Sequence, residues 1–265
     1  SLHDALPIFN CNVTEVPLKL VNGKYTFDFE AMQAALNDNI KVFVLCNPHN
    51  PVGRVYSRVE LENVVTFCDK HNLLLVSDEI HSELIFEGKH IPAFTINEKA
   101  KNISITLASP AKTYNIPALP LGFAIIPNEK IRKVFNQEIL GVFGHPSVLS
   151  VEAFKSAYTE CDEWKKELLQ YLKVNRDYIE DRVSKIKGLK INHNEGTYLS
   201  WIDARETGIE HPYKFFLDKT NIKFSDGVDF GRKQFIRINF GCPRANLKEA
   251  FDRIEKILGS VNSFV

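Results

Sequence analysis

The first half of the chain alternates short apolar runs with amphipathic segments. Mostly apolar runs lie at residues 41–46 (KVFVLC), 73–77 (LLLVS), 103–109 (ISITLAS) and 122–127 (GFAIIP). Runs of this length predict strands that are buried on both faces of a sheet. Between the first two runs, residues 57–71 predict a helix, because Ser57 and Glu60 form an S-x-x-E capping box and apolar residues recur on one face. Strands that alternate with helices predict a mostly parallel sheet with helices on both faces.

The pattern changes at about residue 146. The elements predicted from there on are helices at residues 146–158, 162–186 and 247–258 and strands at 198–203 (YLSWID) and 235–240 (FIRINF). In the last of these helices, one apolar stripe is predicted, formed by Leu247, Phe251, Ile254 and Leu258. We therefore predict the α/β fold class with two domains. Residues 1–158 would hold the mostly parallel sheet and the start of the connecting helices, and residues 159–265 would form a smaller C-terminal α/β domain.

Composition excludes several classes of partner and site. The 265 residues carry 33 Lys+Arg and 33 Asp+Glu, so no net charge directs the protein to nucleic acid or to an acidic membrane. There is no run of about 18 apolar residues, which predicts that no helix spans a membrane. The five cysteines are scattered and never spaced as CxxC, so we expect free thiols in a reducing cytoplasm and no metal site.

The chain starts without an initiator Met and without a basic region followed by an apolar stretch. We therefore expect no secretory signal, and we expect the chain to be a fragment of a longer protein. Its opening SLHDALPIF fits no element pattern.

In a parallel sheet, chemistry gathers beyond the carboxyl ends of the strands. Residues 47–53 (NPHNPVG) follow the first predicted strand, and their two Asn-Pro pairs and glycine indicate a rigid turn. Taken alone, this is an ordinary turn between a strand and a helix. The functional alternative is that Asn50 presents its amide to a ligand at the strand end.

Residues 77–81 (SDEIH) follow the second predicted strand. A carboxylate such as Asp78 at the end of an apolar strand is costly to bury without a cationic partner, and a protonated ring nitrogen would be such a partner. Taken alone, Asp78 is more often a helix N-cap or a salt-bridged loop residue, and His81 is more often a satisfied or exposed histidine.

Residues 109–115 (SPAKTYN) follow the third predicted strand and place Lys112 in a loop. An isolated loop lysine is usually a solvated charge. Three consecutive strand ends nevertheless offer an amide, an acid and an amine that can converge on one crevice. Their joint occurrence favours a functional site over three separate coincidences.

Four segments in this order resemble the fold-type I superfamily of pyridoxal-phosphate (PLP) aminotransferases, and more narrowly its cystathionine β-lyase branch. The segments are CNPHNPVGRV, LLLVSDEIHSELIF, SPAKTYNIPAL and FIRINFGCPR. The resemblance extends from about Val16 to the C-terminal helix, and the segments are specific as a set although each is weak alone. It implies a PLP-dependent transferase fold, with residues 1–158 as the C-terminal part of the large PLP-binding domain.

The resemblance also implies roles for individual residues. Lys112 would carry PLP covalently and then remove the α-proton of the substrate. Asp78 would keep the pyridine nitrogen protonated, so that the ring withdraws electrons. Asn50 and His81 would contact the phenolic oxygen of PLP; ordinary aminotransferases usually carry a tyrosine at the position of His81, and histidine there is a mark of the lyase branch.

Two further roles concern the phosphate and the substrate. Ser109, three residues before the lysine, would bind the phosphate. Arg237 would bind the α-carboxylate of an amino-acid substrate through the planar pairing that arginine favours; without the resemblance it would be a surface salt bridge.

The chain departs from the family pattern in two ways. Many aminotransferases place a phosphate-binding arginine eight residues beyond the lysine, where this chain has Pro120, and the lyase branch often lacks that arginine too. The family's N-terminal portion, which carries the glycine-containing phosphate loop, the aromatic residue that stacks on the ring and part of the dimer contact, is absent. We therefore expect weak or no PLP binding by this fragment alone, and a homodimer for the full-length protein.

The resemblance implies a carbon–sulfur β-lyase that cleaves cystathionine or related cysteine S-conjugates to a thiol, pyruvate and ammonia. An amino-acid aminotransferase on the same fold remains the alternative, because fold does not fix the reaction. A regulatory binding protein is a third class, although no surface in the sequence marks one.

Overall fold

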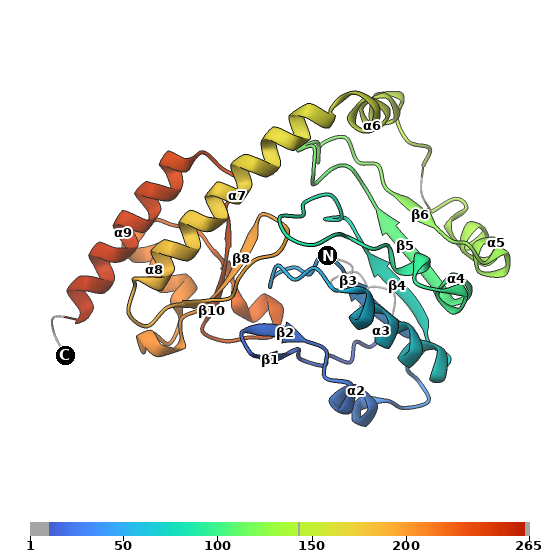
Figure 1. Cartoon of the computed structure of the whole chain (residues 1–265), viewed down its shortest axis with the longest axis horizontal. Helices are drawn as coiled ribbons and strands as arrows, with labels where there is room; N and C mark the ends of the chain where they lie inside the picture. The colour runs from blue at the N-terminus through green and yellow to red at the C-terminus, as the bar shows by residue number, and fades with distance from the viewer. Residues whose placement is uncertain (1–10, 143, 263–265) are drawn as a thin grey trace.

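A computed structural model describes residues 11–142 and 144–262, with side chains up to Gly259. The opening residues 1–10, for which the sequence predicts no element, lie outside the described residues. Four strands form the sheet of the first half: β3 (Val42–Cys46), β4 (Leu74–Asp78), β5 (Ser104–Ala108) and β6 (Phe123–Ile125). They lie in the order β3-β4-β5-β6, with β3, β4 and β5 parallel and β6 antiparallel (Figure 1). The predicted strands and the mostly parallel sheet are thus confirmed.

One face of this sheet is covered by helices. Helix α3 (Arg58–Lys70) begins with the predicted capping box of Ser57 and Glu60, and its buried residues pack against Leu45 and Leu75 of the sheet. The short helices η2 (Ala93–Thr95) and α4 (Glu98–Ile103) join the same core. On the opposite face of β3, the side chains of Val42 and Val44 are exposed, so the prediction that the strands are buried on both faces is wrong for β3.

A hairpin and a helix precede the sheet. Strands β1 (Lys19–Val21) and β2 (Lys24–Thr26) pair antiparallel, and α2 (Phe29–Ala35) begins at Asp28, whose carboxylate accepts a hydrogen bond from the N–H of Ala31. The sequence pattern did not predict these elements.

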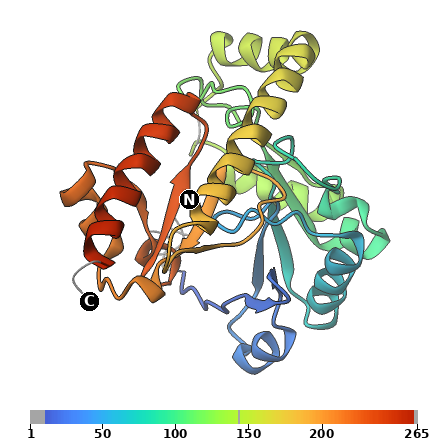
Figure 2. The ribbon, with the colours of Figure 1, turned by 60° about the vertical axis from the view of Figure 1, so that its left-hand side comes forward.

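Three helices connect the two parts of the chain. They are α5 (Glu129–Ile139), α6 (Val148–Glu160) and α7 (Asp162–Ser184). Helices α6 and α7 confirm the predictions at 146–158 and 162–186, and α7 runs from the sheet of the first half to the C-terminal part (Figures 1 and 2). The predicted domain boundary near residue 158 falls inside α6 and stays a prediction.

The C-terminal part is a second four-stranded sheet with helices on it. Its antiparallel strands, in the order β7-β8-β10-β9, are β7 (Lys190–Ile191), β8 (Leu199–Asp203), β10 (Phe235–Asn239) and β9 (Ser225–Asp226). Its helical elements are η3 (Arg205–Thr207), α8 (Pro212–Thr220), η4 (Gly227–Phe230) and α9 (Arg244–Asn262). The core includes Leu247, Phe251, Ile254 and Leu258, the stripe predicted for the terminal helix, and also Leu84, which comes from the first half.

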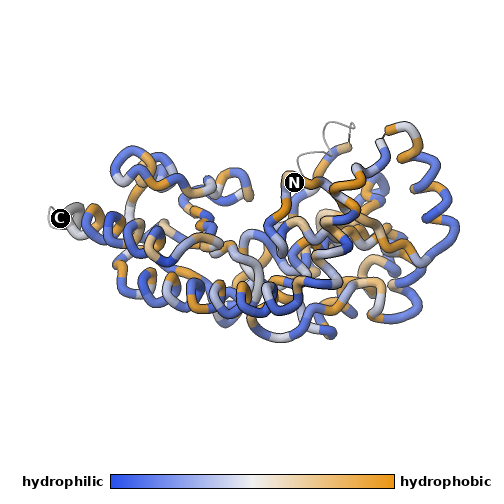
Figure 3. The backbone as a smooth tube through the Cα atoms, turned by 90° about the horizontal axis from the view of Figure 1, so that it is seen from above, coloured by the Kyte–Doolittle hydropathy of each residue, from blue (hydrophilic) through white to orange (hydrophobic). Residues whose placement is uncertain are grey.

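Polar and apolar residues alternate along the helices, as Figure 3 shows. Within the part of the chain that the structure describes, no helix is long and apolar enough to cross a membrane. None of the five cysteines forms a disulfide.

Candidate active site

The carboxyl ends of β3, β4 and β5 lie side by side. Cys46 pairs with Asp78 in the strand register, and Asp78 pairs with Leu107 on the next strand. The three predicted segments therefore leave the sheet at the same edge (Figure 1). This edge, together with the part of the C-terminal sheet that faces it, forms the candidate site.

The turn after β3 is held by both of its ends. The N–H of Asn47 donates to the carbonyl of Asp78 at 3.0 Å, and its buried side-chain oxygen accepts from the N–H of Tyr56 at 3.1 Å. Gly53 closes the turn by donating to the carbonyl of His49 at 2.7 Å with a φ of +70°, a conformation that favours glycine. The turn therefore has little freedom to move Asn50.

Asn50 and Arg237 meet although 187 residues separate them. The Nη1 of Arg237 donates to the side-chain oxygen of Asn50 at 2.8 Å, its Nη2 donates to the hydroxyl of Ser225 at 2.9 Å, and the guanidinium lies 4.7 Å from the ring centre of Phe230. Burial lowers the pKa of Arg237, and its Nε is buried without a hydrogen-bond partner among the described residues. Among the described residues, this half-buried cation donates only to neutral groups, so it is suited to bind an anionic ligand.

Asp78 carries a half-buried carboxylate at the end of β4. Burial raises its pKa, while a hydrogen bond from the N–H of Ile80 at 3.2 Å and the charge of Lys112 act in the opposite direction. The hydrogen bond from Ile80 closes a turn and does not begin a helix, so Asp78 is not a helix N-cap. Among the described residues, no lysine or arginine forms an ion pair with Asp78, which leaves the carboxylate available to a cationic ligand.

His81 is buried, with 4% of its surface exposed. Its ring packs edge-on against Tyr198, with 5.8 Å between the ring centres, and its Nδ1 has no hydrogen-bond partner in the described structure. Burial, helped by the charges of Lys112 and Arg237, lowers the pKa of His81 from 6.5 to about 4. His81 is therefore neutral near pH 7 and can either donate or accept a hydrogen bond.

Lys112 and Ser109 lie in the turn after β5. Residues 110–116 form a single helix-like turn, in which the N–H of Tyr114 donates to the carbonyl of Pro110 at 2.9 Å. The Ser109 hydroxyl donates to the carbonyl of Leu121 at 2.6 Å and accepts from the N–H of Ala111. Lys112 is exposed, and its charge acts on the pKa values of both Asp78 and His81.

A cluster that the sequence did not predict ties these loops to α7. The Nζ of Lys165 lies 2.9 Å from the carboxylate of Glu83 and 5.8 Å from the ring centre of Tyr114, which also stacks on Trp164. Glu83 follows His81 by two residues, and Tyr114 follows Lys112 by two. The sequence places these residues beside the motifs, but no local pattern indicates that they meet on α7.

The buried state of His81 predicts acid sensitivity. Its pKa is about 4 in the folded chain and about 6.5 when exposed, so the unfolded chain binds the proton first. The stability that this group contributes is complete above pH 6.5 and is lost as the pH falls toward 4. When the pH is lowered from about 7.5 to about 5, the free energy of unfolding measured in urea should fall by about 2 kcal/mol less for His81→Gln than for the wild type.

The matched control is His211→Gln, because His211 is exposed. That variant should lose stability on acidification as the wild type does. An equal acid sensitivity of the His81 variant and the wild type would show that His81 does not titrate in this way.

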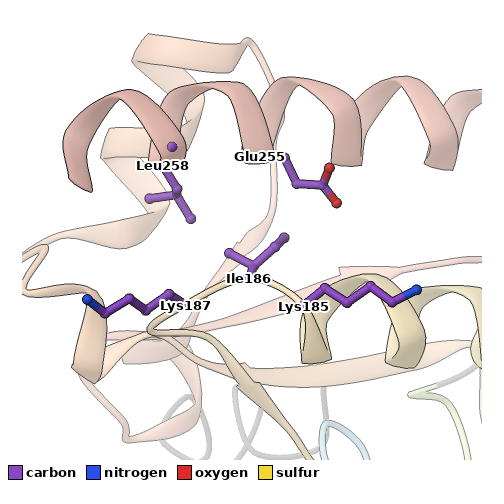
Figure 4. A pocket seen from close by; sticks show the side chains of 6 residues that line it. Lys185, Ile186, Lys187, Glu255 and Leu258 are labelled. Atoms are coloured by element: carbon purple, nitrogen blue, oxygen red, sulfur yellow. The ribbon is translucent and has the colours of Figure 1, made fainter. Parts of the chain in front are cut away.

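A surface hollow of about 370 Å³ lies elsewhere, between the end of α7 and α9. Figure 4 shows that the side chains of Lys185 and Lys187 extend away from each other there. Glu255, on the rim, is paired with Arg182. The hollow brings no reactive groups together and is not part of the candidate site.

Comparison with known proteins adds a family. Residues 6–254 match the family model described as aminotransferase class I and II. The chain is 33% identical over 250 residues to cystathionine beta-lyase PatB of Bacillus subtilis (strain 168), an alignment that covers 91% of this chain and 65% of PatB. The chain thus spans slightly less than two thirds of the length of that relative.

Solved structures resemble the chain over nearly its whole length. The crystal structure of OvoB superposes with a TM-score of 0.94 at 38% identity and covers 97% of this chain and 68% of that one. Cystalysin from Treponema denticola, whose crystal structure contains a pyridoxal 5'-phosphate cofactor, superposes with a TM-score of 0.92 at 31% identity, covering 98% and 68%.

Proposed function

Because the chain belongs to the aminotransferase class I and II family, we propose that it is the larger part of a PLP-dependent carbon–sulfur β-lyase. Its substrates would be cystathionine or related cysteine S-conjugates, and its products a thiol, pyruvate and ammonia. The observation that carries the proposal is the meeting, at one sheet edge, of Asp78, His81 and Lys112 with the bonded pair of Asn50 and Arg237. The name of the relative PatB supports the β-lyase reaction.

The described residues fit PLP in four respects. Asp78 offers a carboxylate without an ion pair to the ring nitrogen, and the buried neutral His81 offers an unpaired ring nitrogen. Lys112 offers an exposed amine at the same edge. Asn50 uses its side-chain oxygen for Arg237, which leaves its NH₂ group free to donate to the phenolic oxygen of the cofactor.

The chain's own residues would bind and orient the ligands and would hold or transfer protons. Bound PLP would supply an electron sink that stabilises negative charge at the substrate Cα. Asp78 would hold a proton on the ring nitrogen, since a nearby carboxylate favours the charged form of that nitrogen. Arg237 would grip the α-carboxylate with its planar fork, as its free Nε allows.

Lys112 would hold the cofactor through its side-chain amine and would also act as the base that takes the proton from the substrate Cα. Loss of that proton allows the Cβ–S bond to break, and the thiol leaves. Hydrolysis of the remaining three-carbon fragment gives pyruvate and ammonia. Ser109 would bind the phosphate by exchanging its hydrogen bond to the carbonyl of Leu121 for one to a phosphate oxygen.

The test is a pyruvate assay on the full-length protein with PLP and L-cystathionine and without any keto acid. Pyruvate release is the expected result. Amino transfer that begins only when a keto acid is added, without pyruvate release from cystathionine, would replace the lyase by the aminotransferase alternative. If the protein showed neither pyruvate release nor amino transfer, and a pull-down found a partner that binds independently of PLP, the regulatory binding protein would be favoured.

We also propose that the full-length protein is a cytoplasmic homodimer. Apolar side chains are exposed at the end of α5 and at the start of α6, where Leu140, Val148 and Leu149 are 84%, 76% and 72% exposed. Exposed apolar surface of this kind marks interaction sites. Light scattering should give the mass of a dimer for the wild type, and Leu140→Glu combined with Leu149→Glu should shift it toward the monomer. A wild-type monomer would exclude the dimer.

A further inference from the structure

Glu195 is a buried acidic residue outside the motifs of the candidate site. Its Oε2 accepts hydrogen bonds from the N–H of Val55 at 2.9 Å and from the Nε of Arg54 at 2.8 Å, and its Oε1 pairs with the Nζ of Lys24 at 2.9 Å. Burial raises the pKa of Glu195, but these hydrogen bonds lower it by a larger amount, so the net shift is downward. Glu195 is therefore a carboxylate at neutral pH that joins three separate segments of the chain.

Arg54 uses every nitrogen of its guanidinium. Beyond its bond to Glu195, its Nη2 lies 2.9 Å and 3.0 Å from the two oxygens of Glu60, and its Nη1 donates to the carbonyl of Tyr25 at 2.6 Å. Arg54 is 5% exposed and lies between two carboxylates. Because it is fully engaged, it fixes Glu195 to the start of α3.

Hydrogen bonds to backbone carbonyls join the same two segments of the chain. The carbonyl of Gly53 accepts from the N–H groups of Glu195 at 2.8 Å and of Gly196 at 3.0 Å, and the amide of Asn192 donates to the carbonyl of Val52 at 2.7 Å. A Cβ on Gly53 would lie 2.5 Å from the side chain of Asn194, so the two segments are in close contact. The turn of residues 47–54 is thus docked on residues 192–196 of the C-terminal part.

This docked turn carries Asn50, three residues before Gly53, and Asn50 is the acceptor for Arg237 on β10. Asn50 thus belongs to one sheet edge while its partner belongs to the other sheet. We propose that Glu195, through Arg54, is a positioning residue that keeps Asn50 and Arg237 bonded and so sets the affinity of the site for the substrate carboxylate. The substrate part of this inference rests on the proposed function.

The experiment compares full-length PLP-loaded variants in their binding of 3-(methylthio)propanoate, a carboxylate that keeps the thioether and lacks the amino group. Glu195→Gln keeps the size of the side chain and removes its charge. Calorimetry should give a Kd about tenfold higher than that of the wild type, with the cofactor absorption spectrum unchanged. In the pyruvate assay, KM should rise by a similar factor while kcat changes less than about twofold.

Val64→Ala is the control for stability alone, because Val64 lies on α3, is fully buried in the apolar core, and takes no part in the hydrogen bonds and ion pairs of Arg54 and Glu195. Compared at equal loss of Tm, it should leave the Kd within about twofold of the wild type. If Glu195→Gln does not fold, Asn192→Ala removes one bond of the same docking and should raise the Kd about threefold.

Unchanged binding in Glu195→Gln, or an equal loss in Val64→Ala, would overturn the positioning role. Failure of the wild type to bind the probe would overturn it as well, because the carboxylate site itself would then be absent. A wild type that binds the probe but releases no pyruvate would reject only the lyase reaction. The two proposals can therefore fail separately.

Discussion

Lys112→Ala should reduce the rate of pyruvate release from cystathionine by about 10³-fold or more. The substitution removes both the amine that carries the cofactor and the base that takes the Cα proton. Lys112 is the lysine whose charge acts on the pKa values of both Asp78 and His81, which supports its proposed role at the site. Steady-state pyruvate assays measure the loss, and borohydride reduction followed by mass spectrometry should place PLP on residue 112 of the wild type only.

Two further variants test whether the loss of activity depends on the positive charge of Lys112 alone or on the removal of any lysine. Lys112→Arg keeps a positive charge beside Asp78 and should be as inactive as the alanine variant, since a guanidinium neither carries the cofactor nor accepts a proton at neutral pH. Lys101→Ala removes a surface lysine of α4 that pairs with Glu98 and should keep activity within about twofold. Turnover in Lys112→Ala comparable to the wild type would reject the assignment.

The part of the fold that could be predicted is the part with a local signal. The capping box at Ser57 and the apolar runs that became β3 to β6 act within a few residues, and the structure contains them. The stripe from Leu247 to Leu258 is buried as its helical spacing required. The hairpin of β1 and β2 was missed because its strands have three residues each and are largely exposed, so they show no apolar alternation.

The candidate site likewise has residues that the sequence predicted and residues that it did not. Asn50, Asp78 and Lys112 were predicted together because parallel strands must end at one edge. The bond between Asn50 and Arg237 depends on the packing of two sheets, which no spacing in the sequence reveals. Residues that act through that packing, Ser225 and Glu195 above all, were therefore not predicted.

Arg237 also connects chemistry with architecture. The first sheet contributes the groups that fit the cofactor, whereas the C-terminal sheet contributes Arg237 and Ser225. Substrate binding would therefore depend on how the two sheets are held, and the docking of the turn around Gly53 is one means of holding them. On this basis, a change at Arg237 should alter substrate affinity more than cofactor binding.

Arg237→Met should lower kcat/KM for cystathionine by about 100-fold, mainly through a higher KM, because the half-buried charge-assisted pair proposed for the α-carboxylate is lost. Methionine fills similar space beside Phe230 but donates no hydrogen bond. Arg237→Lys should lose about tenfold, since a single ammonium cannot reach Asn50, Ser225 and a carboxylate with the geometry of the planar fork.

Arg232→Met is the matched control, because Arg232 is exposed and follows η4 instead of facing Asn50. Its kcat/KM should stay within about twofold of the wild type, and the PLP content of all three variants should equal that of the wild type. A KM in Arg237→Met that equals the wild-type value would mean that another cation holds the carboxylate. In that case the bond between Arg237 and Asn50 would serve to join the two sheets and not to recognise the substrate.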